Sequence, residues 1–267
     1  MSDGSTEAAA ITAGLELVKM GSSNQRLRAA GDNVAYVGEV LTGLLKTALM
    51  PLAVVNARAE VYFNSKFPAE LAAKMKDVPT KYIASPKPSV AGPALQGLGY
   101  SHEEDSLRDL YVSLLATAMD GRVASTAHPG FAEIIGALSA DEVSLLNSVL
   151  TREILPCAEV RIKTEGVEGW NVVHRHLIDA KSDMGSGIPI VNTMNSAYID
   201  NWVRLGLVEV SYMSYLTVEG AYDWVEPRPE YIANVGALTE GQNLTYERGV
   251  IRPSAFGIAF ASAVGIR

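Results

Sequence analysis

Two histidines, His174 and His176, stand two residues apart in a segment rich in β-branched and aromatic residues. Alternate residues of a strand point to the same face, so we expect both imidazoles on one face, with Asp179 nearby as a third metal-binding group. A structural zinc site takes four ligands, and a catalytic site takes three and a water. Because no further histidine or cysteine lies close by, the pattern favours two polar residues on the solvated side of a strand.

A second pattern, Asp179 followed by Ala180 and Lys181, fits half of a metal-dependent nuclease site. Such a site needs an earlier acidic residue on a hairpin, and Glu159 is the candidate. These carboxylates would hold Mg²⁺ through oxygen ligands. The pattern is common by chance, so a magnesium-dependent nuclease is kept only as an alternative function.

The remaining candidate groups have structural explanations. Residues 102–105 read His-Glu-Glu-Asp at an expected helix start, where acidic groups complement the helix dipole. Cys157 follows Pro156 in an apolar stretch, which favours a buried, inert thiol. The hydrolase, P-loop and dinucleotide-binding signatures do not occur in the sequence. We therefore predict no catalytic, cofactor-binding or metal-ligating residues and no cofactor, and the sequence favours a protein that is not an enzyme.

Composition excludes several classes of protein. The chain has 267 residues, is 48% hydrophobic and carries a net charge of −8, which excludes a disordered chain and disfavours the basic surface that phosphate binding needs. A single cysteine excludes a disulfide framework. The sequence begins with an acidic stretch rather than a basic run before an apolar core, so we expect a cytoplasmic location.

Helical patterns dominate the first part of the chain, which we predict to be an α-helical domain over residues 1–152. A capping box at Ser139 and Glu142 opens one of its helices. Residues 84–93 read as a loop in which Pro88, Gly92 and Pro93 set a turn. The expected helices cover residues 6–20, 34–55 with a kink at Pro51, 69–76, 107–119, a short stretch from 130, and 139–150.

The residue composition changes in the last part of the chain, and it predicts an α+β domain over residues 153–267. We expect strands at 158–163, 170–178, 207–212 and 244–251, and helices at 192–204 and 254–264, the first ended by Gly206. Helix, strand, polar loop, strand is the order of a winged helix. Its expected recognition helix has one cation, Arg204, opposed by Asp200. The expected wing is acidic, with Glu219, Asp223, Glu226 and Glu230, so we favour a structural or protein-binding wing over a nucleic-acid binder.

The longest apolar stretch, residues 34–55, raises a membrane alternative. It contains Glu39, Lys46 and Pro51, and a charge at the centre of a membrane span costs about 2.5–3.5 kcal/mol. We favour a buried helix of the protein core. A membrane-perturbing effector that releases this segment stays open as an alternative.

Several segments together resemble one known family. KYIASPKPSVAGPALQGLGY, LRDLYVSLLATAMD and AHPGFAEIIGALSADEVSLL, followed by NWVRLGLVEV and SAFGIAFASA, are similar in order and spacing to the abortive infection alpha (Abi-alpha) family of bacterial phage-defence proteins. The match covers about residues 60–265, and it departs at Pro253 and Ser254, where a threonine is expected.

The resemblance implies a phage-defence effector or adaptor, with no established reaction. With it we predict action through contacts with a protein partner or a phage-derived trigger. A homo-oligomer stays open, contact with a membrane stays unproven, and nucleic acid is disfavoured.

Overall fold

The computed structural model describes residues 57–180 and 189–267. The expected helices at 6–20 and 34–55 lie outside these residues. Within the described part, nine α-helices and four strands give a mixed fold in which helices dominate, as predicted. The described residues divide into two compact units, 57–143 with 262–266 and 144–180 with 189–261 and 267, and the division falls inside helices α8 (Ala140–Leu150) and α11 (Ala255–Ala263).

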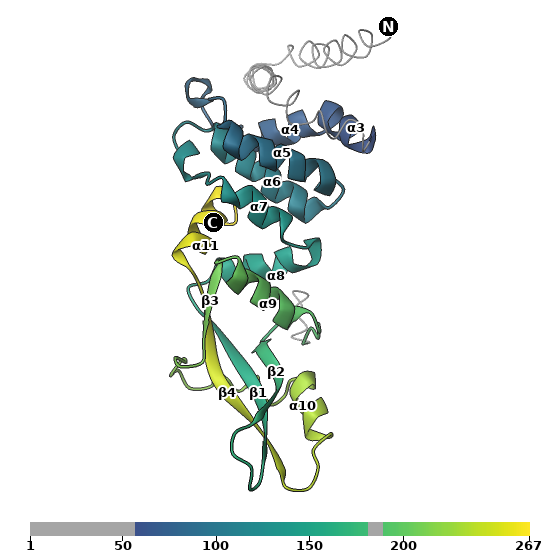
Figure 1. Cartoon of the computed structure of the whole chain (residues 1–267). Helices are drawn as coiled ribbons and strands as arrows, with labels where there is room; N and C mark the ends of the chain where they lie inside the picture. Colours follow the sequence, from purple (N-terminus) through teal and green to yellow (C-terminus); the bar gives the residue numbers. More distant parts are fainter. Residues whose placement is uncertain (1–56, 181–188) are drawn as a thin grey trace. The chain divides into compact units, whose positions relative to one another are not determined.

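The first unit is built around one helix that is buried along most of its length. Helix α6 (Asp105–Met119) has buried residues on every side, including Leu110, Leu114 and Met119. A helix that is apolar all round needs neighbours on several sides, and α4, α5 and α7 supply them (Figure 1). The elements around it are α3 (Ala57–Ser65), α4 (Phe67–Lys74), a 3₁₀ turn at Thr80–Tyr82, α5 (Pro88–Ser101), a 3₁₀ turn at Ala124–Thr126 and α7 (Gly130–Gly136).

The predicted loop at residues 84–93 is wrong in its second half. Helix α5 begins at Pro88 and runs through Gly92 and Pro93 without a turn. Pro88 lies in the first turn, where a missing amide hydrogen costs nothing. Pro93 lies one turn further on and removes the hydrogen bond to the Ser89 carbonyl, but Ser89 is exposed, so water can satisfy that carbonyl.

A tyrosine occupies the space that two glycines leave between α5, α6 and α7. Tyr111 is buried, and its hydroxyl donates to the carbonyl of Ala132 at 3.3 Å. A Cβ atom at Gly97 would lie 2.2 Å from the Tyr111 hydroxyl oxygen, and one at Gly136 would lie 3.1 Å from it. Burial raises the pKa of Tyr111 to about 12, so the hydroxyl stays protonated and able to donate. The two glycines are therefore required by packing.

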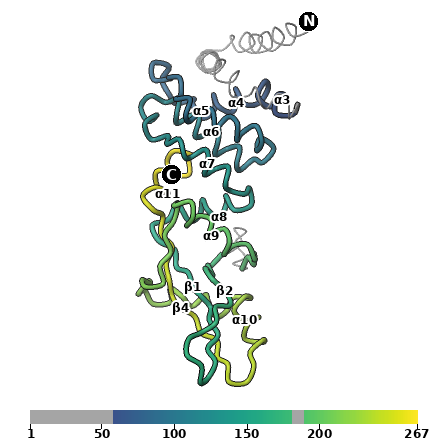
Figure 2. The backbone as a smooth tube through the Cα atoms, viewed as in Figure 1, coloured from purple at the N-terminus to yellow at the C-terminus, as the bar shows by residue number. Residues whose placement is uncertain are grey.

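The second unit carries an antiparallel sheet in the order β2-β1-β4-β3. Figure 2 shows β1 and β4 side by side along their lengths, as their ten-residue register requires. Gly206 has a φ of +72° directly after α9, so the predicted helix end is confirmed. The elements are α8 (Ala140–Leu150), β1 (Leu155–Thr164), β2 (Asn171–Ile178), α9 (Asn195–Arg204), β3 (Val208–Ser211), α10 (Pro229–Val235), β4 (Gln242–Pro253) and α11 (Ala255–Ala263).

One face of this sheet is apolar and is covered by the segment expected to be an acidic wing. Ala158, Val160 and Leu244 form a buried cluster with Tyr222 and Val225 from that segment. The segment also contains helix α10, which the sequence did not predict. Its residue Glu230 accepts hydrogen bonds from the buried Arg228 guanidinium at 3.0 and 2.5 Å. Much of this stretch is therefore part of the core of the second unit.

The glycine requirement around Tyr111 gives a stability prediction. Gly97→Ala places a methyl group against the tyrosine hydroxyl and is expected to lower the free energy of unfolding by about 1–3 kcal/mol, as over-packing does. Gly92→Ala in the same helix is the matched control, because a Cβ there meets nothing within 4 Å. It should change the free energy of unfolding by less than about 1 kcal/mol. Urea denaturation of both variants measures this, and equal losses would contradict the packing argument.

Candidate functional site

Two loops meet at the end of the sheet where β1 turns into β2. The turn between these strands has positive φ at Gly166 and Gly169, and the loop before β4 has positive φ at Gly241. The backbone N–H of Glu165 donates to the carbonyl of Gly241 at 2.8 Å, which joins the two loops (Figure 1). Together they line an open pocket of about 630 Å³. We call residues 163–170 with 239–243 the hairpin end.

A large aromatic side chain projects from the hairpin end. Trp170 is 52% exposed, and its neighbour in the turn, Val167, is 64% exposed. The guanidinium of Arg161 lies over the Trp170 ring, 4.3 Å from its centroid. Two carboxylates hold the Arg161 side chain in place. The stacked guanidinium in turn fixes the orientation of the exposed Trp170 ring.

The arginine that supports Trp170 lies in a charged cluster on the second face of the sheet. Glu159 on β1 stands directly opposite Glu247 on β4. Arg161 donates to Glu159 at 2.8 Å and to Glu247 at 2.7 Å, and Arg175 lies 3.4 Å from Glu159. Glu159 is only 6% exposed, and these arginines are the cations that pair with it. Glu159 thus stands in an ion-pair cluster, and the expected nuclease residue Lys181 lies outside the described residues.

The expectation that His174 and His176 share a face is wrong. Ala158 pairs with Leu177 and Val160 pairs with His174, so Arg175 and His176 together oppose Glu159. This is a β-bulge, in which two residues stand opposite one and the alternation of side chains shifts. His174 pairs with Val160 of the apolar cluster, and its imidazole interacts electrostatically with Glu230 and Arg228. His176 instead contacts Tyr212 and Asp200 on the other side.

His176 is the bulged residue, and its backbone is unusual. Its φ of +54° is the single positive value for a residue other than glycine in the described ranges. The Tyr212 hydroxyl accepts the His176 backbone N–H at 3.1 Å and lies 2.9 Å from Nδ1 of the ring. The Asp200 carboxylate lies 3.1 Å from Nε2. These contacts hold the residue in a conformation that costs about 1–3 kcal/mol.

The chemistry of the partners fixes the hydrogen positions in this chain. A carboxylate can only accept, so Nε2 of His176 carries the hydrogen that Asp200 receives. In the neutral ring Nδ1 is then an acceptor, and the Tyr212 hydroxyl donates to it. Burial is the largest influence on both groups: it raises the pKa of Tyr212 and lowers the pKa of His176. Both groups are thereby held neutral, which suits a structural network that fixes the bulge.

Cys157 adjoins the same network. The thiol is buried, as predicted. Burial raises its pKa to about 12, although the hydrogen bond between the thiol and the Tyr212 oxygen acts in the opposite direction. A thiol held protonated is a poor nucleophile. Its strand neighbour Gly249 leaves room for the Tyr212 ring, because a Cβ there would lie 2.5 Å from a ring carbon.

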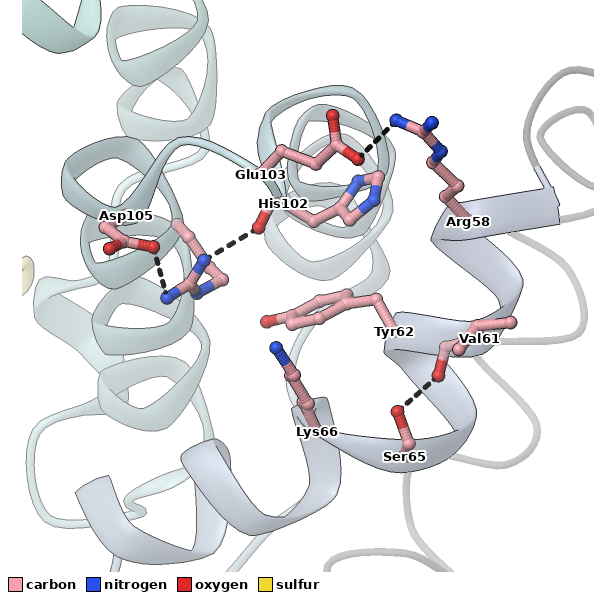
Figure 3. A pocket seen from close by; sticks show the side chains of 9 residues that line it. Arg58, Val61, Tyr62, Ser65, Lys66, His102, Glu103 and Asp105 are labelled. Carbon is pink, nitrogen blue, oxygen red and sulfur yellow. Dashed lines mark hydrogen bonds and ion pairs between the residues drawn. The ribbon is translucent and has the colours of Figure 1, made fainter.

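The first unit has its own open pocket, of about 640 Å³, where α3 meets the junction of α5 and α6 (Figure 3). The ring of Tyr62 stacks on the buried His102, with centroids 5.3 Å apart. His102 Nδ1 lies 2.9 Å from the carbonyl of Gly99, so this nitrogen is the donor. The pocket is lined by Arg58, Val61, Tyr62, Ser65, Lys66, His102, Glu103, Asp105 and Arg108.

Most of the charges around this pocket are paired with one another. Arg108 contacts Asp105 at 2.7 Å and Glu70 at 3.4 Å, and it donates to the His102 carbonyl at 2.8 Å. Tyr62 donates to Glu70 at 2.7 Å, and its pKa is raised mainly by burial and further by this hydrogen bond. Helix α6 begins at Asp105, where its carboxylate stands in the first turn as predicted. This arrangement fastens α3 and α4 to the start of α6.

Among residues 57–180 and 189–267, no group of three or more histidine, cysteine or acidic residues is arranged to hold a metal ion. Within the same ranges no helix has the length and apolar content that crossing a membrane requires. Of the predicted groups, the structure brings His176 and Asp200 together and separates His174 from His176. Arg161 and Trp170, which sequence reasoning missed, form the exposed site. The turn sequence EGVEGW, with a tryptophan after two glycines, was the available signal.

The comparisons with known proteins identify the family. The model of the family described as abortive infection alpha matches residues 60–264. Because this range covers most of the chain, the protein belongs to the abortive infection alpha family. No curated protein and no solved structure matches the chain. Family membership associates the protein with abortive infection, a form of phage defence.

The two histidines predict a pH dependence of stability. Burial lowers the pKa of His174 and of His176 below the ordinary value of 6.5. As pH falls below about 6.5, the unfolded chain takes up protons before the folded one, so the free energy of unfolding should fall. The double variant His174→Asn with His176→Asn should flatten this dependence, because asparagine tolerates positive φ and does not titrate. Urea denaturation between pH 7.5 and about pH 5 measures it.

A second measurement isolates His176. Asp200 raises its pKa against the effect of burial. Asp200→Asn should therefore move the imidazole titration of His176, followed by NMR, to still lower pH. An upward movement would contradict the assigned hydrogen bond.

Proposed function

We propose that this protein is a bacterial, cytoplasmic phage-defence effector or adaptor that acts through protein contacts, with the hairpin end as its contact surface. The observation that carries the proposal is Trp170, an exposed indole whose ring is held by Arg161. Tryptophan is among the residues that contribute most to protein interfaces, particularly when it is rigid before binding. Family membership supplies the setting of phage defence.

The surroundings of Trp170 suit a protein partner. Val167 is exposed in the same turn, and the two joined loops add backbone groups and the Asn243 amide. An aromatic anchor with apolar neighbours and a polar rim is the usual composition of an interface centre. Three glycines with positive φ shape the loops, so the surface has a defined backbone.

We also propose that the α9, β3 and β4 segment is a winged-helix-like element with a structural or protein-binding role, and that the N-terminal part of the chain forms a helical bundle. The single cation of α9 supports this, because Arg204 contacts the side chain of Asn201 on its own helix at 2.7 Å. Asp200 is similarly engaged by His176. Phosphate contacts need available lysine or arginine side chains, and α9 offers little of either.

The proposal predicts that Trp170→Ser abolishes protection against phage while the protein stays folded. Tyr100→Ser is the matched control, since Tyr100 is an aromatic residue of the first unit that is 61% exposed. Cells expressing each variant would be challenged with phage, with protein amount and circular dichroism recorded. We expect a loss of protection of at least about tenfold in plaque number for Trp170→Ser, because interface tryptophans carry about 2 kcal/mol or more.

The control should protect as the native protein does. Equal protection by Trp170→Ser and the native protein would remove the hairpin end from the proposal. Loss of protection in both variants would point to a general effect of surface change, which would also count against this surface.

A further inference from the structure

The carboxylates of the hairpin end outnumber its cations. Glu165, Glu168 and Glu240 are exposed, and Lys163 is the single lysine or arginine of this surface. Glu165 and Glu240 come from different loops, which the hydrogen bond between Glu165 N–H and the Gly241 carbonyl holds together. The hairpin end therefore carries a net charge of −2 around its exposed tryptophan, on a chain whose net charge is already −8.

The tryptophan ring already binds a cation within the protein. The guanidinium of Arg161 lies 4.3 Å from the centre of the Trp170 ring. A cation is attracted electrostatically to the face of an indole ring. Since more than half of Trp170 is exposed, the ring also presents surface to a partner.

We propose that the partner of the hairpin end is a basic protein segment, and that a lysine or arginine side chain of this segment stacks on Trp170. The proposal rests on the proposed function and names the chemistry of its partner. The acidic side chains of the two loops attract the other cations of the segment. The pocket of about 630 Å³ between the loops accommodates one long basic side chain.

The same charges argue against binding of the other macromolecules that exposed tryptophans contact. Single-stranded nucleic acid stacks its bases on aromatic rings, but such sites run along a positively charged groove. Anionic membrane surfaces likewise attract basic segments. At the hairpin end the charge has the opposite sign, so both polyanions are repelled and a polycation is attracted.

The experiment uses the full chain and a fluorescent nona-arginine peptide, with binding followed by fluorescence anisotropy. Trp170→Leu removes the ring and should weaken binding about tenfold. The triple variant Glu165→Gln, Glu168→Gln, Glu240→Gln should also weaken binding about tenfold and flatten its dependence on salt. The matched control replaces three exposed glutamates elsewhere in the same unit, Glu209→Gln, Glu219→Gln and Glu226→Gln. It changes the net charge equally and should leave most of the affinity.

Several results would overturn the inference. Equal losses in the two triple variants would mean that the peptide responds only to net charge. Binding of single-stranded DNA or of phosphatidylserine vesicles that Trp170→Leu abolishes would assign the surface to a polyanion. Unchanged peptide affinity in Trp170→Leu would exclude stacking.

The phage assay separates this inference from the proposed function. If Trp170→Ser loses protection while the peptide binds native protein and Trp170→Leu alike, the contact surface stands and its partner is not basic. If the peptide binds through Trp170 but Trp170→Ser still protects, the basic-segment site stands and the proposed function falls.

Discussion

The second unit depends on one guanidinium placed between two carboxylates. Glu159 and Glu247 stand opposite each other on adjacent strands, where like charges repel, and Glu159 is almost fully buried. Arg161 donates to both and so allows two acidic residues within one sheet. The same group lies under Trp170, so it links the interior of the sheet to the exposed end of its hairpin. Loss of Arg161 would leave the buried Glu159 with Arg175 as its remaining cation and would remove the group that holds the indole.

The two faces of the sheet are stabilised by different kinds of contact. One face is apolar and is covered by the segment around Tyr222 and Val225. The other face is polar, and its groups satisfy one another: the arginine cluster at Glu159, and the chain from Asp200 through His176 to Tyr212. The bulge that places Arg175 and His176 together opposite Glu159 contributes to both of these groups of polar contacts. It directs Arg175 to the carboxylate and turns His176 toward Tyr212, so the strained backbone is held by contacts on either side.

Local patterns in the sequence predicted most of the elements, but not helix α10 or the first turns of α5, and long-range contacts decided the rest. One half of the capping box is confirmed by the hydrogen bond from the Ser139 N–H to the Glu142 carboxylate at 2.7 Å, and Gly206 ends α9 as predicted. The loop expected before Pro93 is helical because its buried face packs against α6 and α7. The local sequence pattern does not reveal these contacts. The separation of His174 from His176 depends on a one-residue shift in pairing, which strict alternation does not reveal. Trp170 had a signal in its sequence, but its support by Arg161 needed the folded hairpin.

The charge pattern connects the fold with the function proposed here. Under the proposed function, a net charge of −8 opposes the approach of nucleic acid and anionic membrane, so a specific contact would come from a local surface. The hairpin end is such a surface, because its indole is fixed before binding and its carboxylates stand on loops shaped by glycine. Rigid aromatic groups lose little conformational entropy when they bind, so even a small surface can discriminate between partners. In a protein of the abortive infection alpha family, a small, rigid and charged surface of this kind suits the proposed contact. Such a contact forms quickly with an oppositely charged partner and is weakened by salt.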